Sequence, residues 1–152
     1  MITFTTKTFE GLSNKELYDV LQLRSEVFVV EQHCVFLDMD SLDEKAHHVL
    51  GYYQTKLVAY ARLFPAGITY AEASIGRVVT HSSVRKLGFG KLLMQYSIKQ
   101  VHELYSTSTI TIGAQCYLKS FYNNLGFGEV GDVYLEDGIE HVKMRLNKSL
   151  RD

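Results

Sequence analysis

A short glycine-containing stretch in the middle of the chain combines residue types that bind anions. Arg85 is followed by Gly88 and then Gly90, between a β-branched run at 75–80 and a segment at 91–104 with apolar residues at helical spacing. A strand, a glycine loop and a helix in this order aim unpaired N–H groups and the positive end of the helix dipole at an anion. The stretch therefore predicts a phosphate site.

Two well-known phosphate-binding loops do not fit this pattern. A Walker loop needs a glycine five positions before Gly90 and a Ser or Thr after Lys91, where this chain has Arg85 and Leu92. A dinucleotide-binding loop needs a third glycine at position 93, which is Leu93. For the loop alone, an ordinary strand-to-helix turn with a capping glycine remains the alternative.

Composition and length narrow the class of protein. The chain has 152 residues, 46% of them apolar, which favours one globular domain over residues 1–152. Its net charge of −1 gives no electrostatic basis for binding nucleic acid or an anionic membrane. No apolar run approaches the ~20 residues of a spanning helix, and the first residues suggest a strand, not a signal peptide. Cys34 and Cys116 match neither metal-ligand spacing nor a disulfide framework, so we expect no metal and a cytoplasmic location.

The hydrophobic pattern predicts strands and helices along the whole chain. Ser13 and Glu16 have the spacing of a capping box that begins a helix, and Gln54-Thr55 and Asp137-Gly138 are hairpin turns. Residues 29–44 have no sustained period, so we expect a loop or a broken second helix there. We predict strands at 2–9, 48–53, 56–64, 75–80, 109–114, 129–135 and 139–146, and helices at 14–28, 91–104 and 117–125. This order indicates a mixed sheet with helices on both faces.

A second motif extends a resemblance to a known family over nearly the whole chain. The segment Phe121-Tyr122-Asn123-Asn124-Leu125-Gly126-Phe127, together with the Arg85 loop and the element order, resembles the GNAT superfamily of acyl-CoA N-acyltransferases over nearly the whole chain. More narrowly, residues 23–34 with Asp40, Asp43 and His48 resemble the ElaA-like branch, known largely as predicted N-acetyltransferases. Lys86 departs from the pattern, because many members carry a glycine at that place.

The resemblance implies both a fold and a co-substrate. The fold is α/β (α+β), a mixed and mostly antiparallel central sheet of about seven strands with helices on both faces. The co-substrate is acetyl-CoA, with the strand end contacting pantetheine and the thioester, the loop N–H groups contacting the pyrophosphate, and Arg85 adding charge. A solvated surface cation is the alternative for Arg85. The residues so implied for acetyl-CoA are Val78, Val79, Thr80, Arg85, Lys86, Leu87, Gly88, Phe89, Gly90 and Lys91.

The implied reaction is attack of an amine on a thioester. It needs an oxyanion donor, a proton for the leaving thiolate and removal of a proton from the ammonium. Tyr122 is the candidate general acid, with simple packing beside Leu118 and Phe121 as the alternative. The base is open between Glu31, His48, His81 and a water relay.

The acceptor pocket is expected from several polar residues. Arg24, Glu31, Cys34, His48 and Arg77 are its candidates, although an ion pair of Arg24 with Glu31 or Asp43 is an equal alternative. The acidic residues 38–44 either attract a cationic amine or form a solvated loop.

These features together predict the function. We expect an acetyl-CoA-dependent N-acetyltransferase that transfers the acetyl group to a primary amine of a small molecule or protein by direct attack in a ternary complex. The partners are acetyl-CoA and the amine, without nucleic acid or membrane, and a homodimer stays open. The alternatives are an acyl-CoA-binding sensor without turnover and a nucleotide-binding regulator that uses the same loop.

Overall fold

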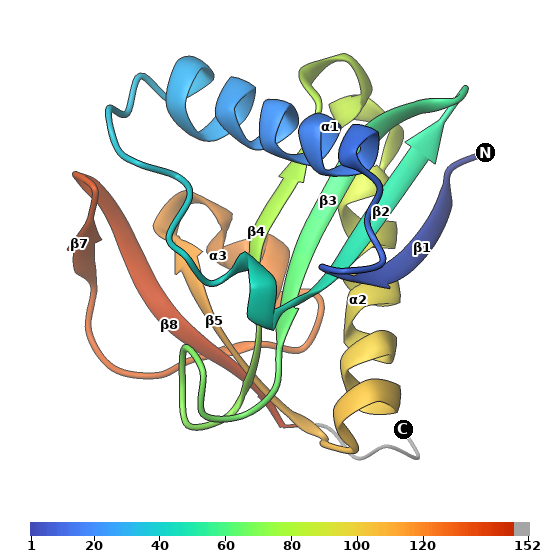
Figure 1. Cartoon of the computed structure of the whole chain (residues 1–152). Helices are drawn as coiled ribbons and strands as arrows, with labels where there is room; N and C mark the ends of the chain where they lie inside the picture. Colours follow the sequence, from blue (N-terminus) through green and yellow to red (C-terminus); the bar gives the residue numbers. More distant parts are fainter. Residues whose placement is uncertain (148–152) are drawn as a thin grey trace.

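A mixed β-sheet forms the centre of the computed structural model, which describes residues 1–147 (Figure 1). Within these residues the sheet has eight strands in the order β1-β2-β3-β4-β5-β8-β6, with β7 also paired to β8. Among the strands of residues 1–147, only β4 and β5 pair in parallel. The strands are β1 (Thr3–Thr8), β2 (His47–Tyr53), β3 (Lys56–Phe64), β4 (Ala73–Thr80), β5 (Thr109–Gln115), β6 (Gly128–Glu129), β7 (Tyr134–Glu136) and β8 (Ile139–Asn147). The predicted mixed, mostly antiparallel sheet is confirmed.

The strand predicted at 129–135 is wrong in one respect, because it forms two short strands instead of one. β6 pairs with Met144 and Arg145 of β8, whereas β7 pairs with the beginning of β8. Gly131, with φ +85°, lies between them in the left-handed region, where an extended strand cannot continue. The described part of the chain therefore forms eight strands where about seven were expected.

Helices cover both faces of the sheet, as predicted. The helix α1 (Asn14–Arg24) continues as the π-helix η1 (Ser25–Glu31) on one face, and α2 (Phe89–Tyr105) lies on the other (Figure 1). The shorter helices are η2 (Asp43–Lys45), η3 (Ser82–Leu87), η4 (Cys116–Leu118) and α3 (Lys119–Asn123). Among the described residues, no helix combines the length and apolar character that crossing a membrane requires.

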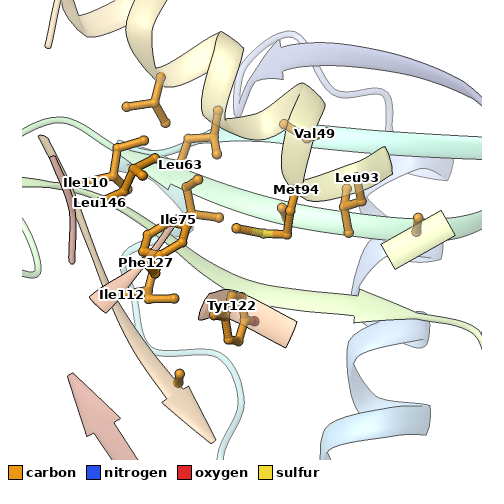
Figure 2. Close-up of a cluster of buried hydrophobic side chains, with 14 of the residues drawn as sticks. Val49, Leu63, Ile75, Leu93, Met94, Ile110, Ile112, Tyr122, Phe127 and Leu146 are labelled. Atoms are coloured by element: carbon orange, nitrogen blue, oxygen red, sulfur yellow. The ribbon is translucent and has the colours of Figure 1, made fainter. Parts of the chain in front are cut away.

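Alternation along the central strands explains why two helical layers can pack. On β2, Val49 joins the cluster that contains Leu93 and Met94 of α2, whereas Leu50 joins the cluster that contains Val20 of α1. Successive side chains of a strand point to opposite faces, so a run of apolar residues buries both faces. Figure 2 shows the cluster on the α2 side, which also holds Tyr122. Burial of each such aliphatic side chain contributes about 1.5–3 kcal/mol.

The local signals in the sequence form the predicted structures. The Glu16 N–H donates to Ser13 Oγ at 3.0 Å and the Ser13 N–H donates to Glu16 Oε1 at 2.8 Å, which is the capping box. Gln54 and Thr55 both have positive φ (51° and 67°), as the two central residues of a tight hairpin turn require. Asp137 and Gly138 do the same between β7 and β8.

The segment at 29–44 resolves into a helical part and a loop. Val29, Val30 and Glu31 extend the first helix, so the predicted boundary at residue 28 is too early. The loop that follows is held by ion pairs with three arginines. Arg24 Nε lies 2.8 Å from Asp38 Oδ2, and Arg24 Nη1 lies 2.8 Å from Asp43 Oδ1. The predicted alternative of an Arg24–Asp43 ion pair is therefore confirmed.

Two further arginines complete this network. Arg62, on β3, lies 2.7 Å from Asp40 and 2.8 Å from Asp43, and Arg77, on β4, lies 2.9 Å from Asp38. The three aspartates are thus neither a free acidic patch nor a solvated loop, which corrects both expectations for them. Glu44 remains exposed.

Candidate active site

The central strand β4 carries a β-bulge where the sheet opens. Tyr60 of β3 pairs with Val79 and Arg62 with Gly76, so two residues of β4 face the single residue between them on β3. One of the two bulged residues, Arg77, has φ +48°, a conformation that a non-glycine residue adopts at a steric cost. The cost is offset locally, because Arg77 Nε and Nη2 both donate to Asp38 at 2.9 Å.

Beyond its first two residues, β4 separates from β5. Within residues 1–147 the two strands pair only through Ala73 with Ile110 and Ser74 with Thr111. Figure 1 shows them diverging from that end of the sheet. The remaining edge of β4, from Ile75 to Thr80, therefore presents backbone N–H and C=O groups that need a partner other than β5.

A cavity of about 370 Å³ occupies this opening. The η1 helix reaches it from the α1 face, and Tyr122 of α3 reaches it from the α2 side. The β7–β8 hairpin closes a third side. The polar and charged residues of its lining are Glu31, Gln32, Arg77, Thr80, Arg85, Gln115, Glu136, Asp137 and His141, together with the hydroxyl-bearing Tyr117 and Tyr122 and the thiol of Cys34.

The glycine loop leads from the end of β4 to the start of α2. Gly88 has φ +77° and is the N-cap of α2, with no side chain capping the helix at this position. A Cβ at Gly88 would meet nothing within 4 Å, so the space in front of the first turn is open. Free N–H groups, the helix dipole and the basic neighbours Lys86 and Lys91 fit an anionic group here.

Arg85 is exposed but has two partners in the protein. Its guanidinium donates to the Thr80 carbonyl at 3.1 Å and forms an ion pair with Glu31. The pair joins the end of η1 to the end of β4 at the edge of the cavity. Arg85 is therefore an exposed surface cation, as the alternative has it, but one paired with Glu31, and its role toward acetyl-CoA stays a prediction.

Tyr122 lines the cavity and is buried, with 6% of its surface exposed. Its ring packs edge-on against Phe121 and Phe127, at centroid distances of 5.1 and 6.0 Å. Figure 2 shows Tyr122 and Phe127 in the same cluster. Burial, and next the nearby Tyr117 phenol, raises the pKa of Tyr122 above its usual value. The hydroxyl is consequently protonated at neutral pH, which a proton donor requires.

The cavity lining includes eight of the residues predicted for the site. Six others, Lys86 to Lys91, form the adjoining loop and first turn of α2. The eight are Glu31, Cys34, Arg77, Val78, Val79, Thr80, Arg85 and Tyr122.

Arg24 and His48 are not among the lining residues, which corrects their placement in an acceptor pocket. Both side chains are fully buried on the α1 side of the sheet. His48 is hydrogen-bonded through Nδ1 to the Tyr60 hydroxyl at 2.7 Å and donates through Nε2 to the Asp43 carbonyl at 2.9 Å. Burial lowers the pKa of His48, so it is a neutral structural histidine.

The other residues considered as bases or pocket residues have structural partners. Cys34 Sγ donates to the Asp137 carbonyl at 3.2 Å and so ties the loop after η1 to the β7–β8 turn. His81 accepts a hydrogen bond from the Ser83 N–H at the start of η3 and lies outside the cavity lining.

Sequence reasoning missed the polar wall made by the β7–β8 hairpin and two glutamines. The amides of Gln32 and Gln115 donate to each other at 3.3 Å and bridge the end of η1 and the end of β5. His141 pairs with Gln115 on one side and Tyr134 on the other. The Asp137-Gly138 turn in the sequence was sufficient to predict that His141 pairs with Tyr134. The pairing of His141 with Gln115 of β5 joins distant parts of the chain and is seen only in the tertiary structure.

A metal ion needs several ligand side chains in a suitable arrangement. Within residues 1–147, no group of three or more His, Cys, Asp or Glu side chains is arranged to hold a metal ion.

The fold and this cavity agree with comparison to known proteins. Residues 12–148 match the family model for the acetyltransferase (GNAT) domain, and the chain belongs to this family. It is 43% identical to a UPF0039 protein of Schizosaccharomyces pombe over 147 residues, covering 95% of this chain and 97% of that protein.

Two bacterial relatives have solved structures. Protein ElaA of Escherichia coli is 38% identical over 146 residues, 95% of each chain, and its crystal structure superposes with a TM-score of 0.89 over 96% of this chain and 99% of that one. An acyl-CoA N-acyltransferase from Pseudomonas aeruginosa has the same TM-score and coverage at 38% identity. The resemblance to the ElaA-like branch is thereby confirmed.

Proposed function

We propose that this protein is an N-acetyltransferase that transfers the acetyl group of acetyl-CoA to a primary amine of a small molecule or protein. The observation that carries the proposal is the opening between β4 and β5, which is lined by Tyr122 and by Arg85, three positions before Gly88 of the glycine loop. The family, and the acyl-CoA N-acyltransferase from Pseudomonas aeruginosa, support it.

The donor would lie along the free edge of β4. Backbone groups of Val78, Val79 and Thr80 can bond the amides of the pantetheine arm in place of a neighbouring strand. The first turn of α2 can accept the pyrophosphate, because its N–H groups are uncapped and Gly88 leaves the approach open. The arm would thus enter the opening with its thioester toward Tyr122.

The thioester supplies the activated acyl group, and the chain supplies position and proton transfer. The amine nitrogen forms a bond to the carbonyl carbon as the carbon–sulfur bond breaks. Tyr122 donates its proton to the sulfur as negative charge develops there, since a phenol cannot protonate the thioester beforehand. An N–H of the β4 edge near the bulge can stabilise the developing oxyanion.

Ligand stabilisation tests the donor site. Acetyl-CoA at a hundredfold excess over its Kd should stabilise the protein by about 2.7 kcal/mol, and thus raise Tm by roughly 5–10 °C. Gly90→Glu should abolish this shift, because it puts a carboxylate at the start of α2. Gly90→Ala is the matched control. A Cβ there meets the Phe121 ring at 3.7 Å, an ordinary contact, so this variant should fold and bind. A normal acetyl-CoA shift in folded Gly90→Glu would refute the donor site.

Turnover separates the enzyme from the alternatives. CoA release in the presence of primary amines, with formation of the amide by mass spectrometry, is expected. Binding of acetyl-CoA without turnover over a broad amine panel would instead indicate the sensor. Stabilisation by ATP and none by CoA would indicate the nucleotide-binding regulator.

A further inference from the structure

One buried histidine of the cavity has no role in the steps above. His141, on β8, is 6% exposed and lines the cavity together with Glu136 of the paired strand β7. A polar side chain this deeply buried beside the opening between β4 and β5 is placed where an acceptor could meet it.

Hydrogen bonding fixes which ring nitrogen of His141 carries the hydrogen. Nδ1 lies 2.8 Å from the Ile139 carbonyl oxygen. A carbonyl oxygen can only accept, so Nδ1 must donate, and Nε2 of the neutral ring keeps its lone pair. The ring is also stacked on Tyr134, with 5.8 Å between centroids and an interplanar angle of 27°. His141 therefore presents a basic nitrogen in a fixed orientation.

A carboxylate lies beside that nitrogen. Glu136 Oε2 is 3.5 Å from His141 Nε2, close enough to receive the N–H of the imidazolium with a small movement. The other groups around the ring are Tyr134 on β7, Gln115 on β5 and Asp137 in the turn.

The other candidate bases are committed elsewhere. Glu31 forms an ion pair with Arg85, and His48 is buried among Tyr60 and the Asp43 carbonyl. His81 caps η3 outside the cavity. His141 differs from these because its Nε2, with the Glu136 carboxylate at 3.5 Å as its neighbour, belongs to a residue that lines the cavity.

From this geometry we infer that His141 Nε2 accepts a proton from the incoming ammonium. The inference rests on the proposed function and adds the residue that activates the acceptor. The attacking nitrogen of R–NH3⁺ loses two protons in forming the amide. The first passes to Nε2 and then to solvent. The second leaves as the C–N bond forms and replaces, through water, the proton that Tyr122 has given to the thiolate. The sum is R–NH3⁺ and acetyl-CoA giving the amide, CoA–SH and one proton.

Nitrogen-15 NMR of the histidine side chains tests the resting state without any acceptor. The neutral His141 ring should show a protonated Nδ1 and an unprotonated Nε2, with assignment by loss of the signal in His141→Gln. The opposite tautomer, or an imidazolium that persists at pH values where the enzyme turns over, would overturn the inference.

The pH dependence of kcat/KM tests the role in catalysis. We would use acetyl-CoA with 2-phenylethylamine, spermidine and Nα-acetyl-lysine as acceptor probes. The native chain should show an acidic limb and then a plateau below the pKa of the amine. In His141→Gln, kcat/KM should depend only on the fraction of unprotonated amine, so it should keep rising until the pH reaches the pKa of the amine. The loss should be roughly 100-fold near neutral pH and shrink as pH rises.

Two controls separate a catalytic from a structural effect. His47→Gln changes a histidine on another strand, β2, which is partly buried and lies outside the cavity lining, and it should keep the native profile. The acetyl-CoA Tm shift should be unchanged in His141→Gln. A constant loss at all pH values would mean that His141 is only structural, and a native profile in His141→Gln would refute its role while leaving the proposed function intact. Acetyl-CoA binding without turnover of any probe by the native chain would refute the proposed function and, with it, the role of His141.

Discussion

Tyr122 shows how one hydroxyl can be separated from the ring that carries it. The ring is part of the core, in contact with Phe121 and Phe127, whereas the hydroxyl belongs to a residue that lines the cavity. Both the packing interpretation and the acid interpretation of the sequence are thus compatible with its burial. Only removal of the oxygen alone distinguishes them.

Tyr122→Phe is expected to lower kcat by about 100-fold, or ~3 kcal/mol at the transition state, with little change in acetyl-CoA affinity. The ring keeps its contacts, so the fold should persist. The loss should shrink for acyl donors whose leaving thiol has a lower pKa, because such thiolates need less help to depart. Steady-state and single-turnover kinetics measure it.

The control for this variant is Tyr96→Phe. It removes a hydroxyl that accepts a hydrogen bond from the Thr6 hydroxyl at 3.1 Å. Tyr96 does not line the cavity. It should leave kcat unchanged. If Tyr122→Phe keeps more than about half of kcat while chemistry limits the rate, Tyr122 is not the acid and the ring has a packing role only.

The loop between η1 and η2 stabilises the bulge of β4. Asp38 is 5% exposed and contacts both the fully buried Arg24 and the bulged Arg77. Its carboxylate therefore connects α1, the loop and the strand whose free edge lines the cavity. A segment without periodic hydrophobicity is ordered here by charge and hydrogen bonds.

Asp38→Asn should destabilise the protein by about 3 kcal/mol, because it leaves part of a buried ion-pair network uncompensated. It should also weaken the Tm shift given by acetyl-CoA, since Arg77 loses the partner that offsets its positive φ. Urea unfolding and ligand-dependent melting measure the two effects. Glu44→Gln, at an exposed acid of the same segment, should change stability by no more than ~0.5 kcal/mol. Equal stability of Asp38→Asn and Glu44→Gln would contradict the role given to the loop.

The molecule as a whole joins two apolar layers to one buried polar network. The α1 and α2 clusters lie on opposite faces of the sheet, and the arginines and aspartates lie on the α1 side, beside Tyr60. Burial tends to raise the pKa of Asp40, but the hydrogen bond and charge of Arg62 outweigh it and lower the pKa to about 2. Burial also tends to raise the pKa of Asp43, but the hydrogen bonds and charges of Arg24 and Arg62 outweigh it and lower this pKa.

Acid should therefore destabilise the whole domain in a defined range. An aspartate whose pKa is lowered in the folded protein stabilises the fold at pH values above its pKa in the unfolded chain, which is ~3.9. This stabilisation is lost as the pH falls toward the folded pKa of Asp40, about 2. The urea midpoint should accordingly decline between about pH 4 and pH 2. Asp40→Asn should be less stable than the native chain at neutral pH and decline less over that range. A parallel decline in both proteins would assign the acid sensitivity to other groups.

Local patterns made much of this protein predictable from its sequence. The capping box at Ser13, the turns at Gln54 and Asp137, and the alternation on β2 and β3 depend on residues close together in the chain, whose spacing fixes their geometry. The spacing of Arg85, Gly88 and Gly90 is also local, and together with the Phe121-Tyr122 motif it is sufficient to indicate the family.

Contacts between distant residues decided the rest. Arg24 and Arg77 both meet Asp38, 14 and 39 positions away, and Gln32 meets Gln115, 83 positions away. Sequence spacing cannot distinguish an arginine that lines a pocket from one that neutralises a buried aspartate, because both need only a charged residue at an inward position. The same is true of His48 and His141, which have the same ionisable ring. The packing of β2 under α1 makes the first a neutral part of the core, whereas the pairing of β8 between β5 and β7 places the second at the wall of the cavity.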